Sequence, residues 1–191
     1  MLVEASGPQS TRGRQRLDEA GYRAGNGGVR FHLTMKTSTL EDTRLLAGVL
    51  QQQLAQVGIE LDLRSFEFAT FYSDITRGAF QIYSMRWIGG NEQPDILEYV
   101  FSTARFSPKG ANRSHYSNEE VDRLLADADT NPIQDQRRKD YERVQQILET
   151  DLPAVNLWYL DTVVVHNRRV AHVEPNASGS YTFLETAKLA K

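Results

Sequence analysis

The side chains that could do chemistry are few in this sequence, and they lie far apart. No two of the four histidines have the spacing of a metal-binding motif. No serine stands in the G-x-S-x-G pattern of a hydrolase, and there is no cysteine to act as a nucleophile or thiolate ligand. We therefore expect no metal site and no nucleophilic enzyme. We expect solvated surface positions for the histidines, which are His32, His115, His166 and His172.

Two glycine-rich stretches, residues 25–28 and 89–90, resemble phosphate-binding loops only in composition. A P-loop needs Gly-Lys-Ser/Thr at the start of a helix, because the lysine and the hydroxyl meet phosphate and magnesium. A dinucleotide site needs G-x-G-x-x-G after a strand. Neither pattern occurs in the sequence. We interpret both stretches as turns and expect no cofactor.

Acidic pairs occur at two positions that also read as first turns of helices. These pairs are Glu41–Asp42 and Glu119–Glu120. Negative charge in a first turn stabilises the positive end of the helix dipole. The helix positions therefore account for both pairs without a role in acid–base catalysis.

Length and composition are those of an ordinary globular protein. The 191 residues are 40% hydrophobic and 25% charged, which allows one domain with a core of its own. The net charge of −3 provides no basic field for nucleic acid, so we expect no nucleic-acid partner. No run approaches the ~18 apolar residues needed to span a bilayer.

The first half of the chain alternates between the periods of strands and helices. Apolar residues alternate in the three segments that we expect to be strands, and recur at helical spacing between them. This order predicts an α/β fold with a mostly parallel sheet. The expected elements are a helix over 10–20, strands over 29–36, 59–66 and 80–87, and helices over 39–57 and 67–78.

The second half is mainly helical. A helix is expected from Pro94 or Asp95, and two more over 118–129 and 134–150. The Ser117-x-x-Glu120 pattern predicts a capping box at the start of the 118–129 helix. Residues 153–167 read as one or two strands, with Trp158 packed in the core.

Several separated motifs, in a fixed order, resemble one known family. They are "FHLTM", "LAGVLQQQLAQVGIELDLRSFEFATFYSDITRGAFQIYSMRWIGG", "SHYSNEEVDRLLADAD" and "QRRKDYERVQQILETDLPAVNLWYLDTVVVHNRRV". Together with "LDEAGYRAG" they cover roughly residues 15–185. This order is similar to that of the extracellular solute-binding proteins of ABC importers, in the oligopeptide, dipeptide and nickel class.

The resemblance implies one part of a two-lobed receptor that closes on a solute and delivers it to a membrane permease. Residues 1–170 would be the C-terminal, ligand-binding lobe, a periplasmic-binding-protein-like α/β fold with a mixed, mostly parallel sheet flanked by helices. Residues 171–191 would be the tail that returns to the first lobe. The implied partners are a small solute such as a peptide or an oligosaccharide, the permease, and the missing first lobe.

The resemblance also implies a location. The full-length parent would lie in the periplasm or at the extracellular face of the membrane. The first residues of this chain lack the apolar centre of ~7–15 residues that an export signal needs, so we expect the chain to be a fragment.

The family resemblance places the ligand cleft at the end of the third predicted strand. There the family's backbone pairs with an extended peptide as an added strand would. Arg86 is either an anchor for an anionic group or a surface cation, and Trp87 either lines the cleft or packs in the core. The residues that we expect to bind ligand are Phe68, Arg86, Trp87, Ile88, Gly89, Gly90 and Asn91.

This sequence departs from the family pattern at the position that matters most for peptides. The family's aspartate, which takes the peptide amino terminus, falls on Gly90, and a second acidic position falls on Gln93. A cleft arginine of some members falls on Ile75. An ammonium buried without its carboxylate costs several kcal/mol, so a neutral or differently anchored solute is favoured. The alternative to a receptor is a free-standing α/β enzyme or regulatory domain derived from such a lobe.

Overall fold

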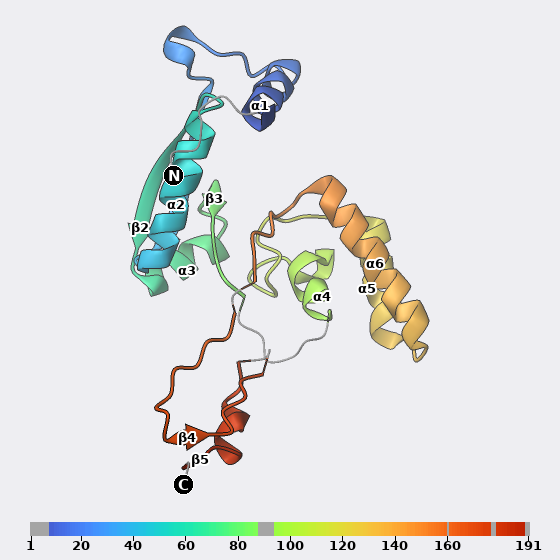
Figure 1. Ribbon diagram of the computed structural model, residues 1–191. Helices are drawn as coiled ribbons and strands as arrows, with labels where there is room; N and C mark the ends of the chain where they lie inside the picture. Colours follow the sequence, from blue (N-terminus) through green and yellow to red (C-terminus); the bar gives the residue numbers. More distant parts are fainter. Residues whose placement is uncertain (1–7, 88–93, 160, 177–178, 190–191) are drawn as a thin grey trace. The chain divides into compact units, whose positions relative to one another are not determined.

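The structure is a computed structural model that describes residues 8–87, 94–159, 161–176 and 179–189 (Figure 1). The chain divides into two compact units, Met1–Arg86 and Trp87–Lys191, which we call the first and second units and describe separately. The boundary expected near residue 170, between lobe and tail, is a different division and stays a prediction.

The first unit is built on a three-stranded parallel sheet with the strand order β2-β1-β3. Each strand is joined to the next through a helix, as parallel pairing requires. This arrangement confirms the predicted α/β class. The elements are α1 (Pro8–Glu19), the 3-10 helix η1 (Asn26–Gly28), β1 (Phe31–Ser38), α2 (Glu41–Ala55), β2 (Ile59–Phe66), α3 (Phe68–Thr76) and β3 (Ile82–Tyr83).

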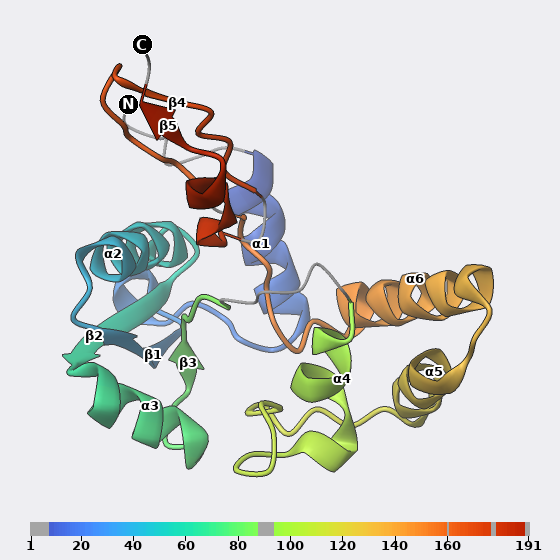
Figure 2. The same ribbon diagram turned by 90° about the horizontal axis from the view of Figure 1, so that it is seen from below.

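Different helices cover the two faces of this sheet (Figure 2). Met35 of β1 is buried against Ala47 of α2 and Leu61 of β2. The next residue, Lys36, points to the opposite face because successive strand side chains alternate. Its ammonium lies 2.7 Å from a carboxylate oxygen of Asp74, on α3. Helix α2 therefore packs on one face of the sheet and α3 on part of the other, where His32 of β1 and Glu60 of β2 stay exposed.

The third strand is much shorter than its sequence predicts. An apolar run indicates a strand over 80–87, but only Ile82–Tyr83 pair with β1. Strand pairing depends on hydrogen bonds to a neighbour as well as on the strand's own residues, so an apolar pattern does not fix its length. Residues 84–87 run on from β3 without regular structure.

Gly58 sets the entry into β2. Its φ of +85° lies in the left-handed region, which glycine adopts without steric cost. A Cβ there would lie 2.5 Å from the carbonyl oxygen of Gly28. The Gly58 carbonyl also accepts a 2.7 Å hydrogen bond from the Arg30 amide. One residue without a side chain thus ties the turn before β1 to the start of β2.

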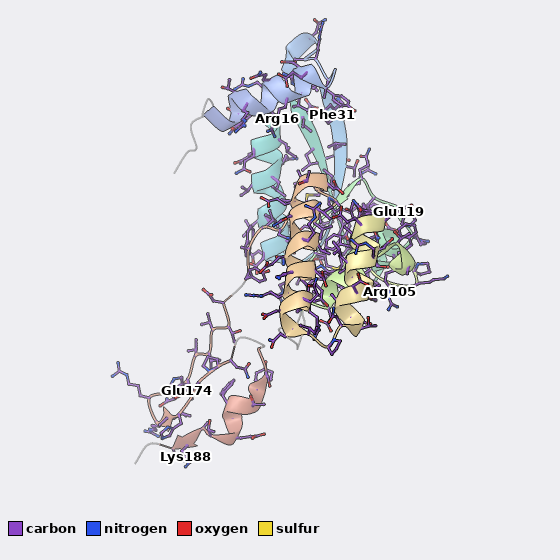
Figure 3. All side chains as sticks on the ribbon, turned by 90° about the vertical axis from the view of Figure 1, so that its right-hand side faces the viewer. Arg16, Phe31, Arg105, Glu119, Glu174 and Lys188 are labelled. Carbon is purple, nitrogen blue, oxygen red and sulfur yellow. The ribbon has the colours of Figure 1, made fainter. Side chains whose placement is uncertain are left out.

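The second unit has a helical core of its own. Helices α5 and α6 lie side by side as a hairpin, and Figure 3 labels Glu119 at the start of α5. The buried side chains between them are Val121, Leu124, Leu125, Ala128, Tyr141, Val144 and Ile147. The unit's elements are α4 (Ile96–Phe101), the 3-10 helix η2 (Thr103–Arg105), α5 (Glu119–Thr130), α6 (Gln134–Asp151), β4 (Val170–Ala171), the 3-10 helix η3 (Tyr181–Glu185) and β5 (Lys188–Leu189).

The N-cap of α5 differs by one residue from the prediction. Asn118, not Ser117, caps the helix, and its side-chain oxygen accepts hydrogen bonds from the amides of Glu120 and Val121. The Ser117 hydroxyl instead accepts a 3.1 Å hydrogen bond from the Thr103 hydroxyl. Asn118 has the extended backbone that a cap requires, which explains why it takes the role.

The prediction of strands over 153–167 is wrong in the part of the chain that the structure describes. Residues 153–159 and 161–167 form no ladder, and Trp158, predicted to be buried, is 61% exposed. A strand needs a neighbour, and no described segment pairs with this one. Further on, β4 and β5 form a two-residue antiparallel ribbon. Within the described residues, no helix is both long and apolar enough to cross a membrane.

Candidate ligand-binding site

Trp87, the first residue of the second unit, stands among side chains from two other segments. The residue is 47% exposed. It meets the Tyr99 ring of α4 edge to face, with 6.5 Å between centroids and 79° between planes. The guanidinium carbon of Arg113 lies over the Trp87 ring, 5.5 Å from its centroid. We call Trp87, Tyr99 and Arg113 the aromatic–guanidinium cluster.

A buried asparagine fixes the loop that carries Arg113. Asn112 is fully buried, and its amide nitrogen donates to the carbonyls of Ser102 (3.0 Å) and Tyr116 (2.7 Å). Its side-chain oxygen accepts from the Tyr116 amide at 3.0 Å. The neighbouring Ala111 amide donates to the Tyr99 carbonyl at 3.0 Å. The loop is therefore attached to the residue of α4 that touches Trp87.

A second exposed aromatic pair lies on the first unit. Phe68 begins α3 and is 57% exposed, and its ring stacks on Tyr72 one turn later, with centroids 5.9 Å apart. One side of α3 faces inward through Phe71 and Ile75, which are 2% and 0% exposed. The position where some family members carry a cleft arginine, Ile75, is thus part of the core in this chain.

The remaining predicted ligand-binding residues lie at the unit boundary. Arg86 is exposed. Ile88, Gly89, Gly90 and Asn91 lie outside the described residues, as does Gln93. The half-exposed ring of Trp87 is compatible with cleft lining, but the assignment of all seven residues to a ligand site stays a prediction.

The histidines are exposed, as predicted. All four lie at the surface. His32 faces Glu60 at 3.0 Å with both side chains largely in solvent, and the His115 ring stacks on Phe106 at 4.7 Å. In the ranges that the structure describes, no three His, Cys, Asp or Glu side chains come together as a metal site.

Ion pairs outside the aromatic–guanidinium cluster shift the pKa values of several groups. Hydrogen bonds from Lys36 and Arg77 lower the pKa of the Asp74 carboxyl. The hydrogen bond to Glu98 raises the pKa of Arg105. These groups stay charged near neutral pH, and each has its partner within its own unit. The Lys36–Asp74 pair joins β1 to α3, and the Arg105–Glu98 pair joins η2 to α4.

Sequence reasoning missed Tyr99 and Arg113. Tyr99 lies in an apolar helical run that reads as core, and Arg113 lies in a polar loop. No periodic pattern links the two, because the loop from η2 to α5 brings them together through the hydrogen bonds of Asn112. The one available signal was that Tyr99, a large aromatic residue, lies near Trp87 in the sequence. Nearness in sequence does not show that the two rings touch.

Comparison with known proteins identifies the family. The model of the bacterial extracellular solute-binding proteins, family 5 Middle, matches residues 6–108, more than half of the chain. The chain belongs to this family. Members of family 5 are extracellular or periplasmic solute-binding proteins, so the resemblance expected from the motifs is confirmed.

Two curated relatives of this family 5 chain are named as peptide-binding proteins. The oligopeptide-binding protein AppA of Bacillus subtilis (strain 168) is 30% identical over 156 residues, which are 76% of this chain and 28% of that protein. The probable D,D-dipeptide-binding periplasmic protein DdpA of Escherichia coli (strain K12) is 32% identical over 130 residues, 65% of this chain and 24% of that protein. The chain thus spans about a quarter of each relative.

A solved structure agrees with the family 5 fold. The oligopeptide-binding protein AppA from Bacillus subtilis in complex with a nonapeptide superposes with a TM-score of 0.76 at 26% identity. The match covers 95% of this chain and 37% of that structure. The periplasmic-binding-protein-like fold predicted from the sequence is therefore confirmed.

Proposed function

We propose that this chain is one lobe of the solute receptor of an ABC-type importer, which captures a peptide or another small solute in an interlobe cleft. The receptor then delivers the solute to a membrane permease. The permease and the first lobe of the same polypeptide are the protein partners. The full-length receptor acts in the periplasm or at the extracellular face of the membrane.

The observation that carries this proposal is the family match over residues 6–108, which contains all seven elements of the first unit complete. The names of two relatives, the oligopeptide-binding and the D,D-dipeptide-binding protein, favour a peptide solute. The exposed rings of Phe68 and Trp87 support ligand contact, because each lies beside a second aromatic ring, Tyr72 or Tyr99, and offers apolar surface to a ligand.

We also propose that the chain is not an enzyme. Its relatives are named for binding, and its four histidines are exposed side chains. The enzyme alternative predicts turnover. Incubating the native gene product with peptides and oligosaccharides and analysing the mixture by mass spectrometry should return the ligands unchanged; any catalytic conversion would favour the alternative.

A thermal-shift screen tests the receptor function. The native gene product should be stabilised by its solute, because a ligand that binds only the folded state raises stability by mass action. The 191-residue chain alone should show little or no shift with the same solute, since a cleft needs both walls to bury its ligand. Equal, strong shifts in both proteins would refute the two-lobed site.

A further inference from the structure

The aromatic–guanidinium cluster has the geometry of a pre-organised surface. Arg113 is only 7% exposed, and its guanidinium covers the Trp87 ring. Tyr99 braces the same ring edge to face. Cation–π attraction stabilises the guanidinium over the Trp87 ring, and the ring quadrupoles favour the edge-to-face contact with Tyr99. Nearly half of the Trp87 surface nevertheless stays open to solvent.

Backbone hydrogen bonds hold the two segments that support Trp87. Arg113 follows the fully buried Asn112, and the Arg113 amide donates to the Ala111 carbonyl at 2.9 Å. The Ala111 amide is bonded to the carbonyl of Tyr99. A ring held this way loses little conformational entropy when a ligand packs on it, and pre-organisation is what makes such contact add to affinity.

We propose that Arg113 is a positioning residue, which with Tyr99 holds Trp87 as a platform for a ligand that presents a flat apolar face. A sugar ring and an aromatic side chain of a peptide both provide such a face. This inference rests on the proposed receptor function and names the class of solute. Tyr99 contributes the second ring of the platform.

Tryptophan fluorescence tests the positioning role without any ligand. In a Trp158→Phe background, Trp87 is the remaining tryptophan of the chain. Arg113→Met should increase acrylamide quenching of Trp87 about twofold, because the covered face opens to solvent. Arg113→Lys keeps a cation near the ring and should restore most of the protection. Arg123→Met, an exposed arginine on α5, is the matched control and should change nothing.

Binding to the native gene product tests the class of solute. The probes are tetra-alanine, a tetrapeptide with one phenylalanine among alanines, and cellotetraose. Arg113→Met and Tyr99→Leu should each weaken a ring-bearing probe about three- to tenfold and leave tetra-alanine nearly unchanged. Whether the phenylalanine peptide or cellotetraose responds distinguishes the two sources of the flat face.

The outcomes separate this inference from the receptor function. Unchanged quenching in Arg113→Met would overturn the positioning role. An equal loss for tetra-alanine and the ring-bearing probes would show a general structural effect and would overturn the platform. If the wild-type protein binds none of the three probes or any other solute in the thermal-shift screen, the receptor function fails, and the class of solute fails with it. The quenching result still decides the role of Arg113.

Discussion

Asn112 illustrates how one polar side chain can organise a loop that has almost no regular structure. The side chain is fully buried and bonds four backbone groups, at Phe101, Ser102 and Tyr116. Buried carbonyls and amides without partners cost about 1–3 kcal/mol each. Residues 111–113 of the loop from η2 to α5 can therefore be buried, because Asn112 supplies the hydrogen bonds that a helix or sheet would otherwise provide.

We expect Asn112→Ala to lower the free energy of unfolding of the second unit by about 3 kcal/mol, since it strands several buried backbone groups. Urea denaturation followed by circular dichroism measures the change. Asn118→Ala, which removes only the cap of α5, is the control and should cost about 1 kcal/mol. Equal losses in the two variants would contradict the anchoring role of Asn112.

Tyr116 links the same loop to the end of α6 and should make stability fall at high pH. Its hydroxyl donates to Asp151 at 2.6 Å. Burial, and next the hydrogen bond to Asp151, raises the pKa of Tyr116 from 10.0 to about 12. The folded state therefore favours the neutral phenol, so this contribution is complete below pH 10 and is lost as the pH rises from 10 to about 12.

The difference in unfolding free energy between the wild type and Tyr116→Phe should thus shrink over that interval. Urea titrations at several pH values measure it, and phenolate absorbance of the folded protein should show one late-ionising tyrosine that the variant lacks. Tyr72→Phe, an exposed tyrosine on α3, serves as the control. A constant difference across the interval would rule out the shifted pKa.

At individual positions, the sequence predicted roles that depend on neighbours along the chain. It placed Glu119–Glu120 in a first turn because a helix dipole acts locally. It missed the role of Asn112, because that role depends on residues ten positions away in the chain. It placed the cap of α5 at Ser117 because serine and asparagine are both good caps, and only backbone geometry chooses between them.

The C-cap of helix α6 is Leu152, whose backbone conformation is unfavourable for a residue with a side chain. Leu152 has φ of 50° and ψ of 49°, the left-handed conformation that glycine usually takes at this position. Its side chain is 62% exposed, so it gains little burial in return. A β-carbon in this conformation costs about 1–2 kcal/mol. The end of α6 is therefore a place where stability can be added.

We expect Leu152→Gly to raise the free energy of unfolding by about 0.5–1 kcal/mol, the relief of strain less the extra entropy of glycine in the unfolded chain. Differential scanning calorimetry should show a higher Tm. Glu149→Gly, inside the same helix, should lower stability by about 0.5–1 kcal/mol. If both glycine variants are destabilised alike, the backbone at residue 152 is not strained.

Helices followed their sequence signals more closely than strands did. The helical period predicts the ends of α5 and α6 to within about two residues. The hydrogen bonds of a helix form within its own segment, and the apolar stripes of these two helices pack against each other in the hairpin. The strands of the β1–β2 pair were equally clear, since β1 and β2 pair along eight residues. Residues 80–87 and 153–167 were overpredicted, because an extended apolar segment becomes a strand only where a partner is present.

Residues 153–167 also bear on the size of the functional protein. Val155, Trp158, Val163 and Val165 are 61–93% exposed, although the sequence has the apolar character of a buried strand. The chain spans about a quarter of its curated relatives. Both facts agree with the proposal that further polypeptide covers this segment.

We expect Trp158→Asp to change the stability of the 191-residue chain by no more than about 0.5 kcal/mol, as for other exposed sites. In the longer gene product proposed above, the same change should cost at least about 2 kcal/mol, because it would bury a charge. Chemical denaturation of both proteins makes the comparison. Thr162→Asp, a polar exposed neighbour, should be mild in both. A mild Trp158→Asp in the longer protein would show that this segment stays uncovered.

The geometry at Gly58 has a consequence for how this sequence can vary. Any L-residue there would combine an unfavourable φ of +85° with an overlap at 2.5 Å from the Gly28 carbonyl. Gly48, in the middle of α2, has no atom within 4 Å of its missing Cβ. A random library selected for folded protein should therefore accept alanine freely at 48 and keep glycine at 58. Substitutions can accumulate over most of this α/β unit, but its first crossover depends on a single residue that cannot be exchanged.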